Sequence, residues 1–100
     1  MNNDSFARND YIVQSIPYRI REVPADDPHV EDCYGRWQGK TIYLCEDSPW
    51  EERLETLVHE TGHIITEGRD EVDLTKEDDL RWYNMMLVDT LLRNGIISAD

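Results

Sequence analysis

The sequence predicts an α+β fold in which a small antiparallel sheet of three strands packs against two helices. Three observations support this prediction: a stretch rich in β-forming residues before residue 24, a hairpin pattern around Gly39, and two helical stretches after residue 48. The chain has 100 residues, which suits one domain with a modest core. We therefore expect a single domain over residues 11–100, preceded by a disordered polar tail over residues 1–10.

The first predicted strand runs from about Tyr18 to Val23, where apolar residues are interspersed with charged ones. Pro17 indicates an edge, a bulge or the beginning of this strand. After an acidic loop over residues 24–29, residues 33–45 read as a β-hairpin with Gly39 supplying a positive φ in the turn. Alternation places Ile42 and Leu44 on one face, where they can receive the apolar side of a helix.

The first helix is predicted from about Pro49 to Glu67, ending near Gly68. Ser48 can cap the first backbone donors, and Pro49 suits the first helical position. At about 100° per residue, the core-facing side chains fall in one arc of about 120°. This arc contains Leu54, Leu57, Val58, Thr61, Ile64 and Ile65.

A second helix is predicted from a cap at Thr75 to about Asn94, with Gly95 as its terminator. Its apolar stripe consists of Leu80, Tyr83, Leu87, Val88 and Leu91. On the helical wheel Glu77 and Asn84 fall inside this stripe, so we expect both to face inward.

The charge of the chain argues against two classes of partner. A net charge of -12 repels phosphate backbones and anionic lipids, so we expect neither nucleic acid nor a membrane as partner. No apolar run reaches the length of a membrane span, and the N-terminus lacks the pattern of a signal peptide. We therefore expect a cytoplasmic protein. In that compartment Cys33 and Cys45 are expected as two thiols, although the hairpin makes a disulfide conceivable.

The chemical signal is the motif His59-Glu60-Thr61-Gly62-His63, a His-Glu-x-x-His pattern on a predicted helix. Its two imidazoles are one turn apart on the side opposite the apolar arc, so both can bind one Zn²⁺ ion. Glu60 can then act as general base toward a zinc-bound water. Gly62 costs about 1 kcal/mol of helix stability relative to Ala. Either a close approach by neighbouring backbone explains this glycine, or it is a neutral accident.

A catalytic zinc needs a third protein ligand. Position 69, where one common pattern has a histidine, holds Arg69. Glu77 on the inward face of the second helix is the first candidate, because a buried carboxylate needs a partner, and Asp73 is the next. The alternative is that Glu77, in the first turn, stays solvated and interacts favourably with the helix dipole. Asn84 either orients a ligand or is a tolerated polar residue at a helix contact. His29 is expected to be an exposed loop residue.

These segments also resemble a known group of proteins. The residues that carry the resemblance are segments 16–23 and 42–44, the motif segment 55–63 and the helix end 91–95. In their order and pattern they resemble small phage and prophage zinc metallopeptidase-like proteins. These are distantly related to the ImmA/IrrE metallopeptidases and have a minimal gluzincin fold. The resemblance covers about residues 12 to 95, and His-Glu-x-x-His is its one highly specific motif.

The resemblance implies a minimal zincin-like domain with zinc held by His59, His63 and Glu77, and with Glu60 as general base. Together with the motif it predicts a zinc-dependent metallopeptidase-like protein that hydrolyses a peptide or protein substrate. The alternative is a non-catalytic, zinc-stabilised phage protein that binds a host or phage partner. A third hypothesis is a metal-free acidic adaptor.

Overall fold

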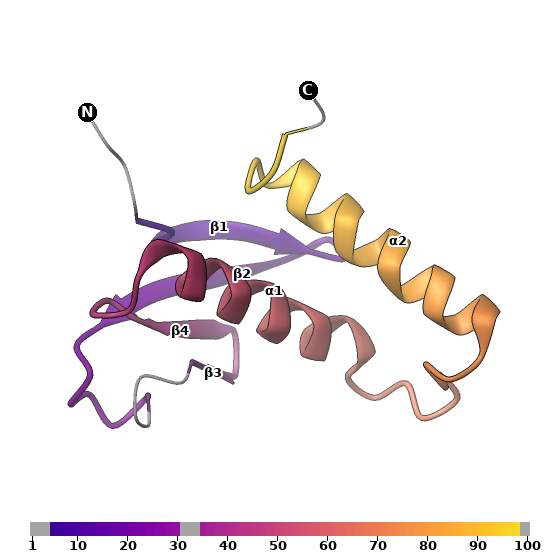
Figure 1. The fold of residues 1–100 in the computed structure, drawn as a ribbon, viewed down its shortest axis with the longest axis horizontal. Helices are drawn as coiled ribbons and strands as arrows, with labels where there is room; N and C mark the ends of the chain where they lie inside the picture. Colours follow the sequence, from indigo (N-terminus) through magenta and orange to yellow (C-terminus); the bar gives the residue numbers. More distant parts are fainter. Residues whose placement is uncertain (1–4, 31–34, 99–100) are drawn as a thin grey trace.

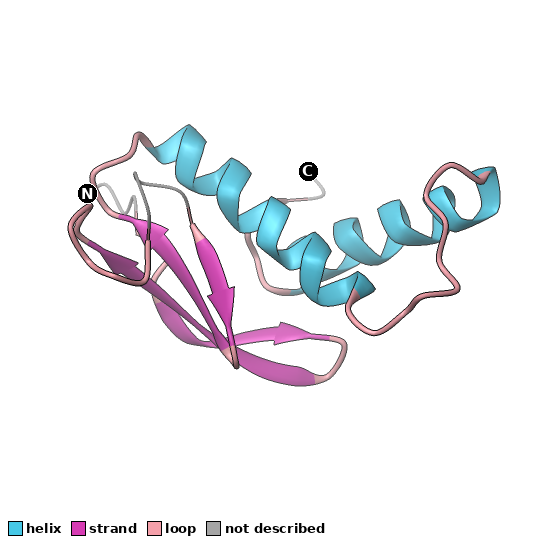
Figure 2. Cartoon of the chain, turned by 90° about the horizontal axis from the view of Figure 1, so that it is seen from below, coloured by secondary structure: helices cyan, strands magenta, loops and turns pink. Residues whose placement is uncertain are grey.

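The computed structural model describes residues 5–30 and 35–98. The elements are, in chain order, β1 (Arg8–Val13), β2 (Ile16–Val23), β3 (Arg36–Gln38), β4 (Thr41–Cys45), α1 (Trp50–Thr66) and α2 (Glu77–Arg93). Both helices lie on the same side of the sheet, with α2 packed beside α1 (Figure 1, Figure 2). Within these residues, neither helix has the length and apolar character needed to cross a membrane.

The sheet has four strands in the order β1-β2-β4-β3. The outer pairs, β1 with β2 and β3 with β4, are antiparallel, whereas the central strands β2 and β4 are parallel. The predicted α+β class is confirmed. The prediction of three antiparallel strands is wrong, because β1 adds a fourth strand and the sheet is mixed. Strand β4 begins at Thr41 beside Arg19, near the starting end of β2, as parallel pairing requires.

Strand β1 lies partly in the segment predicted as a tail. It begins at Arg8, and Phe6 before it is buried, so the predicted disorder does not hold for residues 5–10, while residues 1–4 lie outside the described part of the chain. The turn to β2 contains Gln14 and Ser15, both with positive φ (51° and 71°). Tight hairpin turns of this kind usually use Asn-Gly or Asp-Gly, and the absence of that signature hid the hairpin.

The second hairpin agrees with the prediction. Gly39 has φ 62° in the turn, and Trp37 pairs with Ile42 across β3 and β4. Ile42 and Leu44 are fully buried on the face that meets α1. Cys45, at the end of β4, is disulfide-bonded, which corrects the expectation of a thiol at this position; Cys33 lies outside the described residues. That expectation rested on the predicted compartment and not on geometry.

Helix α1 presents its predicted apolar side to the sheet. Leu57, Thr61 and Ile65 have no exposed surface, and the helix stops just before Gly68, which has φ 72°. The predicted cap is wrong in detail: Pro49 occupies the N-cap position, and no side chain caps the helix. The start of α1 is instead held by a side chain inside the helix, Arg53.

Arg53 and Glu22 form an ion pair that joins α1 to β2. Their side chains are 10% and 11% exposed, and the Arg53 Nη1 donates to both carboxylate oxygens of Glu22 at 3.0 Å. Arg53 Nε also donates to the Ser48 carbonyl at 3.1 Å. The backbone N–H of Phe6 donates to the same Glu22 carboxylate at 2.7 Å. The pair therefore ties the N-terminal segment, β2 and the beginning of α1 together.

Helix α2 is rotated relative to the wheel prediction. Glu77 and Asn84, predicted to face inward, are exposed, as are Leu80 and Val88. The face directed at the rest of the protein consists of Tyr83, Met86, Leu87, Thr90, Leu91 and Asn94. At about 100° per residue, this face is turned by about 60° from the predicted stripe. The wheel weighed apolar side chains alone, whereas Thr90 and Asn94 are polar anchors on the true inner face.

Asn94 fixes the C-terminal end of α2 to strand β1. Its side-chain oxygen accepts from the Ile12 N–H at 2.8 Å, and its Nδ2 donates to the Ile12 carbonyl at 2.7 Å. Arg8 Nη1 donates to the Asn94 carbonyl at 2.6 Å. Gly95 follows with φ 72° and ends the helix as predicted. The end of α2 is thus held by backbone groups of an edge strand.

The Arg53 ion pair leads to a stability prediction. Arg53→Met leaves the Glu22 carboxylate buried without its charged partner, and removing one member of a buried pair costs about 3–5 kcal/mol. Arg93→Met is the matched control, because Arg93 pairs with Asp89 at the surface and such pairs contribute about 0.5 kcal/mol or less. Urea unfolding measures both free energies. Equal losses in the two variants would show that the buried pair does not hold α1.

Candidate metal centre

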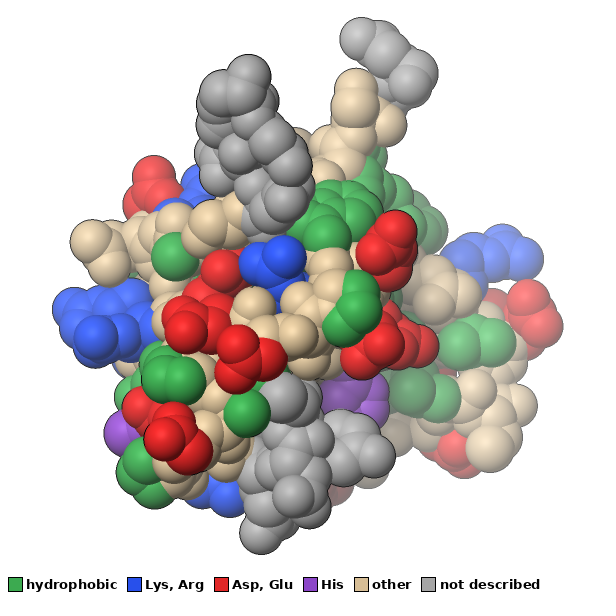
Figure 3. Space-filling view, turned by 60° about the vertical axis from the view of Figure 1, so that its left-hand side comes forward, with side chains coloured by type: hydrophobic (Ala, Val, Ile, Leu, Met, Phe, Trp, Pro, Cys, Tyr) green, Lys and Arg blue, Asp and Glu red, His purple; other side chains and the backbone are tan. Residues whose placement is uncertain are grey.

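The motif histidines lie together on the outer side of α1. Both His59 and His63 are exposed, and their Nε2 atoms are 3.0 Å apart, close enough for one N–H to donate to the other nitrogen. The rings are perpendicular, at 89°, with centroids 4.5 Å apart. Histidine side chains are visible at the surface beside acidic ones in Figure 3. The predicted placement of both imidazoles opposite the core-facing side of α1 is therefore confirmed.

The separation of the two nitrogens suits a shared metal ion. Two nitrogen ligands at about 2.0–2.1 Å from a tetrahedral zinc ion are about 3.3–3.4 Å apart. The Nε2 atoms of His59 and His63, at 3.0 Å, are already near this spacing. Neutral imidazole nitrogens are also the donors that zinc prefers. These two residues therefore fit two positions of a zinc site.

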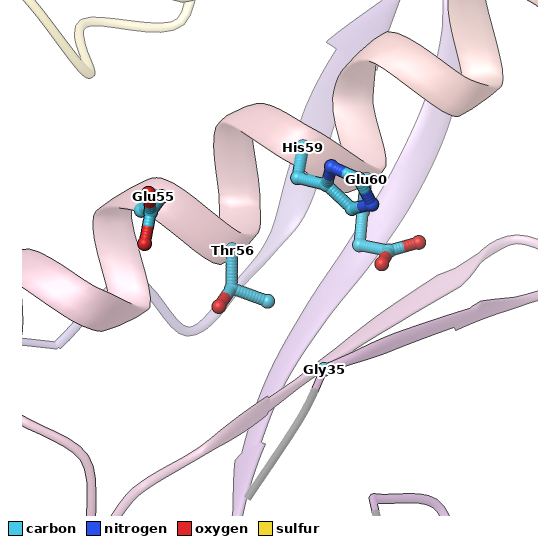
Figure 4. A pocket seen from close by; sticks show the side chains of 5 residues that line it. All are labelled: Gly35, Glu55, Thr56, His59 and Glu60. Atoms are coloured by element: carbon cyan, nitrogen blue, oxygen red, sulfur yellow. The ribbon is translucent and has the colours of Figure 1, made fainter.

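Glu60 occupies a different environment from its histidine neighbours. It is only 9% exposed, and burial raises the pKa of its carboxyl above the ordinary value, while His63 and His59 act in the opposite direction. In Figure 4 its side chain extends from α1 toward the side where Gly35 lies. A carboxylate in such a position can take up and return a proton next to the histidine pair.

A cavity of about 300 Å³ lies beside this cluster, between α1 and the residue that precedes β3. It is lined by Gly35, Glu55, Thr56, His59 and Glu60 (Figure 4). A Cβ atom on Gly35 would overlap the Thr56 methyl group and lie 2.8 Å from the Tyr43 carbonyl oxygen. Glycine is therefore needed for the chain to pass so close to the helix at one wall of the cavity.

Thr61, inside the motif, anchors the opposite side of α1. Its hydroxyl donates to the Leu57 carbonyl and accepts from the Tyr11 hydroxyl, both at 2.7 Å. Tyr11 on β1 is fully buried, and burial raises its pKa. These bonds fix the rotation of α1 against the sheet, and this rotation keeps His59 and His63 on the outer side.

Gly62 is explained by helix α2. A Cβ atom at this position would overlap the hydroxyl of Tyr83, which lies on the inner face of α2. The sequence left a close approach by backbone and a neutral accident as alternatives, and the structure places a side chain, that of Tyr83, against this glycine. The contact joins the two helices next to His63.

The candidates for a third ligand lie apart from the histidine pair. Glu77 is the first residue of α2; its side chain is 81% exposed, with Arg81 Nη2 at 3.9 Å. Asp73 accepts bonds from the Thr75 N–H and hydroxyl, which lower the pKa of the Asp73 carboxyl. In residues 5–30 and 35–98, no three His, Cys, Asp or Glu side chains are grouped so that they can hold a metal ion.

The remaining predicted residues have local roles. Asn84 is exposed on the outer face of α2, so the structure does not bring it near the motif. His29 is only partly exposed: its ring stacks on Tyr43 with centroids 4.2 Å apart, and its Nδ1 lies 2.8 Å from Asp27 Oδ1. His29 is therefore a packing residue of its loop.

Sequence reasoning missed several residues that position the site. A signal for Glu22 was present, because strand alternation places it on the same face as Tyr18 and Ile20, where a charge needs a partner. Glu55 also had a signal, since it precedes His59 by four residues and lies on the same side of the helix. Gly35 had none, because its role depends on a contact distant in sequence.

Comparisons with known proteins add nothing to this geometry. No protein-family model matches the chain, and neither a curated protein nor a solved structure matches it.

The Gly62 contact makes a prediction that opposes helix propensity. Gly62→Ala should gain about 1 kcal/mol from propensity alone, but the added methyl group would meet Tyr83. We expect a net destabilisation of about 1–3 kcal/mol, the usual cost of overpacking. In a double-mutant cycle measured by urea unfolding, Tyr83→Phe should recover part of this loss. A stabilised Gly62→Ala protein would contradict the contact.

Proposed function

We propose that the protein is a zinc-dependent metallopeptidase-like protein that hydrolyses peptide bonds. One observation carries the proposal: the paired Nε2 atoms of His59 and His63, 3.0 Å apart, lie on the same helix as the buried carboxylate of Glu60. A solvated helix face that carried two histidines by chance would not require the intervening Glu60 to be buried. The cavity beside His59 and Glu60 provides a place for a substrate group.

Each residue of the motif has a distinct role in this proposal. His59 and His63 would hold the ion through their Nε2 atoms. When bound, zinc would polarise a substrate carbonyl and acidify a nearby water. Glu60 would accept a proton from the water whose oxygen attacks the carbonyl carbon, and would return it to the amine that leaves when the peptide C–N bond breaks. The Thr61 bonds to Leu57 and Tyr11 keep the helix from rotating during these transfers.

Strand β3 offers a way to orient the substrate. It is the edge strand on one side of the sheet, and Gly35 immediately before it lines the cavity. An extended peptide can add to such an edge through backbone hydrogen bonds. We propose that the substrate lies along β3, so that one of its peptide bonds reaches His59 and Glu60.

Glu77 remains our proposal for the third ligand, on the strength of the family resemblance, with Asp73 as the next choice. Glu77 is exposed, and its ion pair with Arg81 is long, so exchanging Arg81 for a metal ion costs little free energy. Asp73 is already engaged with Thr75, and releasing it costs two hydrogen bonds. This comparison favours Glu77 over Asp73.

A second function deserves testing because the described residues do not group a third ligand with the histidines. Both imidazoles are also open to solvent, and the cavity is small for a substrate cleft. These observations favour a non-catalytic, zinc-stabilised phage protein that binds a host or phage partner. This alternative requires zinc-dependent stability without turnover.

The zinc site can be tested with another histidine of the same chain, His29, as the control. Full-length protein should bind about one zinc ion per chain, measured by metal analysis and isothermal titration. His59→Ala should lose this binding, whereas His29→Ala should retain it, because His29 stacks on Tyr43 instead of joining the pair. Glu77→Gln should weaken zinc binding about 10- to 100-fold or more, and Asp73→Asn should not. A metal content unaffected by His59→Ala refutes the zinc site.

Catalysis is tested separately from metal binding. Glu60→Gln preserves side-chain size but removes the proton acceptor, so it should abolish peptide hydrolysis while zinc binding stays near one ion per chain. Hydrolysis can be followed by mass spectrometry on a denatured protein substrate. If the wild-type protein binds zinc but turns over no substrate, the peptidase proposal fails, and the non-catalytic, zinc-stabilised protein that binds a partner takes its place.

A further inference from the structure

The cavity beside the histidine pair has walls of one charge sign. Of the five described residues that line it, Glu55 and Glu60 carry carboxylates, and none is Lys or Arg. Glu60 is buried, whereas Glu55 is exposed and precedes His59 by one helical turn. Glu55 is therefore the carboxylate that a side chain entering from solvent meets first.

The surface around the cavity has the same sign. Residues 46–79, which include α1 and its flanking loops, contain 13 acidic and three basic side chains, a net charge of -10. Two of the three basic side chains are engaged elsewhere: Arg53 is paired with Glu22, and the Arg69 guanidinium lies 5.3 Å from the centroid of the Trp82 ring. Acidic side chains gather over the middle of the face seen in Figure 3.

The other face of the sheet has the opposite character. Arg21 pairs with Tyr43 across β2 and β4, and Tyr43 pairs with Arg36 across β4 and β3. Alternation places these side chains, together with Arg19, on the face away from α1, and all three arginines are exposed. The molecule is therefore electrically polarised, and its field guides a cationic ligand toward the α1 side.

We propose that the cavity recognises peptides through a Lys or Arg side chain, which pairs with Glu55. The inference rests on the proposed function, since it assigns a substrate class to the same site. Attraction by the whole acidic surface brings basic peptides close, and Glu55 makes the local contact that selects the position of the basic residue. Glu55 is thus a specificity residue beside the motif, distinct from the proton carrier Glu60.

Equilibrium binding tests this proposal without requiring turnover. Three fluorescein-labelled decapeptides would be identical except that three positions carry Arg, Gln or Glu. Their affinities for full-length Glu60→Gln protein are measured by fluorescence anisotropy, with and without one equivalent of zinc. We expect the arginine peptide to bind more than about fivefold more tightly than the glutamine peptide, because one exposed ion pair contributes up to about fivefold and the acidic surface adds to it. This preference should shrink as salt increases.

A matched pair of variants separates the local contact from the overall charge. Glu55→Gln and Glu51→Gln, each added to Glu60→Gln, remove the same charge from the same helix, but Glu51 does not line the cavity. We expect Glu55→Gln to reduce the arginine-over-glutamine ratio about fivefold. Glu51→Gln should change it less than twofold. Equal effects of the two variants would overturn the inference, because the preference would then come from net charge alone.

The outcomes also separate this inference from the proposed function. Suppose that zinc binds and the wild-type protein cleaves peptides, but the arginine-over-glutamine affinity ratio is the same with and without Glu55→Gln in the Glu60→Gln protein. The inference about the substrate then fails, while the proposed function stands. If zinc does not bind but the Glu55-dependent preference persists, the recognition of basic peptides stands while the peptidase proposal fails. If neither zinc binding nor the preference is found, both fail.

Discussion

Helix α1 must pack one side against the sheet and keep two imidazoles on its opposite, exposed side. The rest of the structure follows from how it does both. Its inner side is fixed to the sheet by Leu57 and Ile65 and by the hydroxyl of Thr61, all without exposed surface. The buried Arg53 pair fixes its first turns to β2. With one side and one end so constrained, the outer side cannot rotate away, and the two imidazoles stay together on the exposed side of the helix.

The parts of the fold that obey local rules could be predicted from the sequence. The hairpin at Gly39 and the C-terminal ends of both helices, at Gly68 and Gly95, followed from the conformational preferences of glycine. The sheet-facing side of α1 followed from its period. The failures have physical causes. Strand β1 begins in a polar segment whose pairing depends on a turn without the usual residues, and the rotation of α2 is set by Asn94, whose polarity hides its burial.

The residues of the candidate site also fall into those that local rules predict and those that depend on contacts between distant segments. His59, His63 and Glu60 lie within five residues of one helix, so helical geometry alone was enough to bring them together. The prediction for Glu77 depended instead on the rotation of a second helix, and a turn of about 60° at about 100° per residue is enough to move a side chain from an inner face to solvent. Gly35 and Tyr83 depend on contacts between distant segments, which no local pattern encodes.

The Asn94 amide has a consequence for how this protein can associate. An exposed edge strand is a template on which another chain can add. At Ile12 on β1, both the N–H and the carbonyl are already bonded to Asn94, so the side chain occupies the place of a neighbouring strand. Addition of a strand at this point of β1 is thereby blocked by a residue from the far end of the chain. Growth of the sheet by a foreign strand is directed to the opposite margin, where β3 borders the cavity.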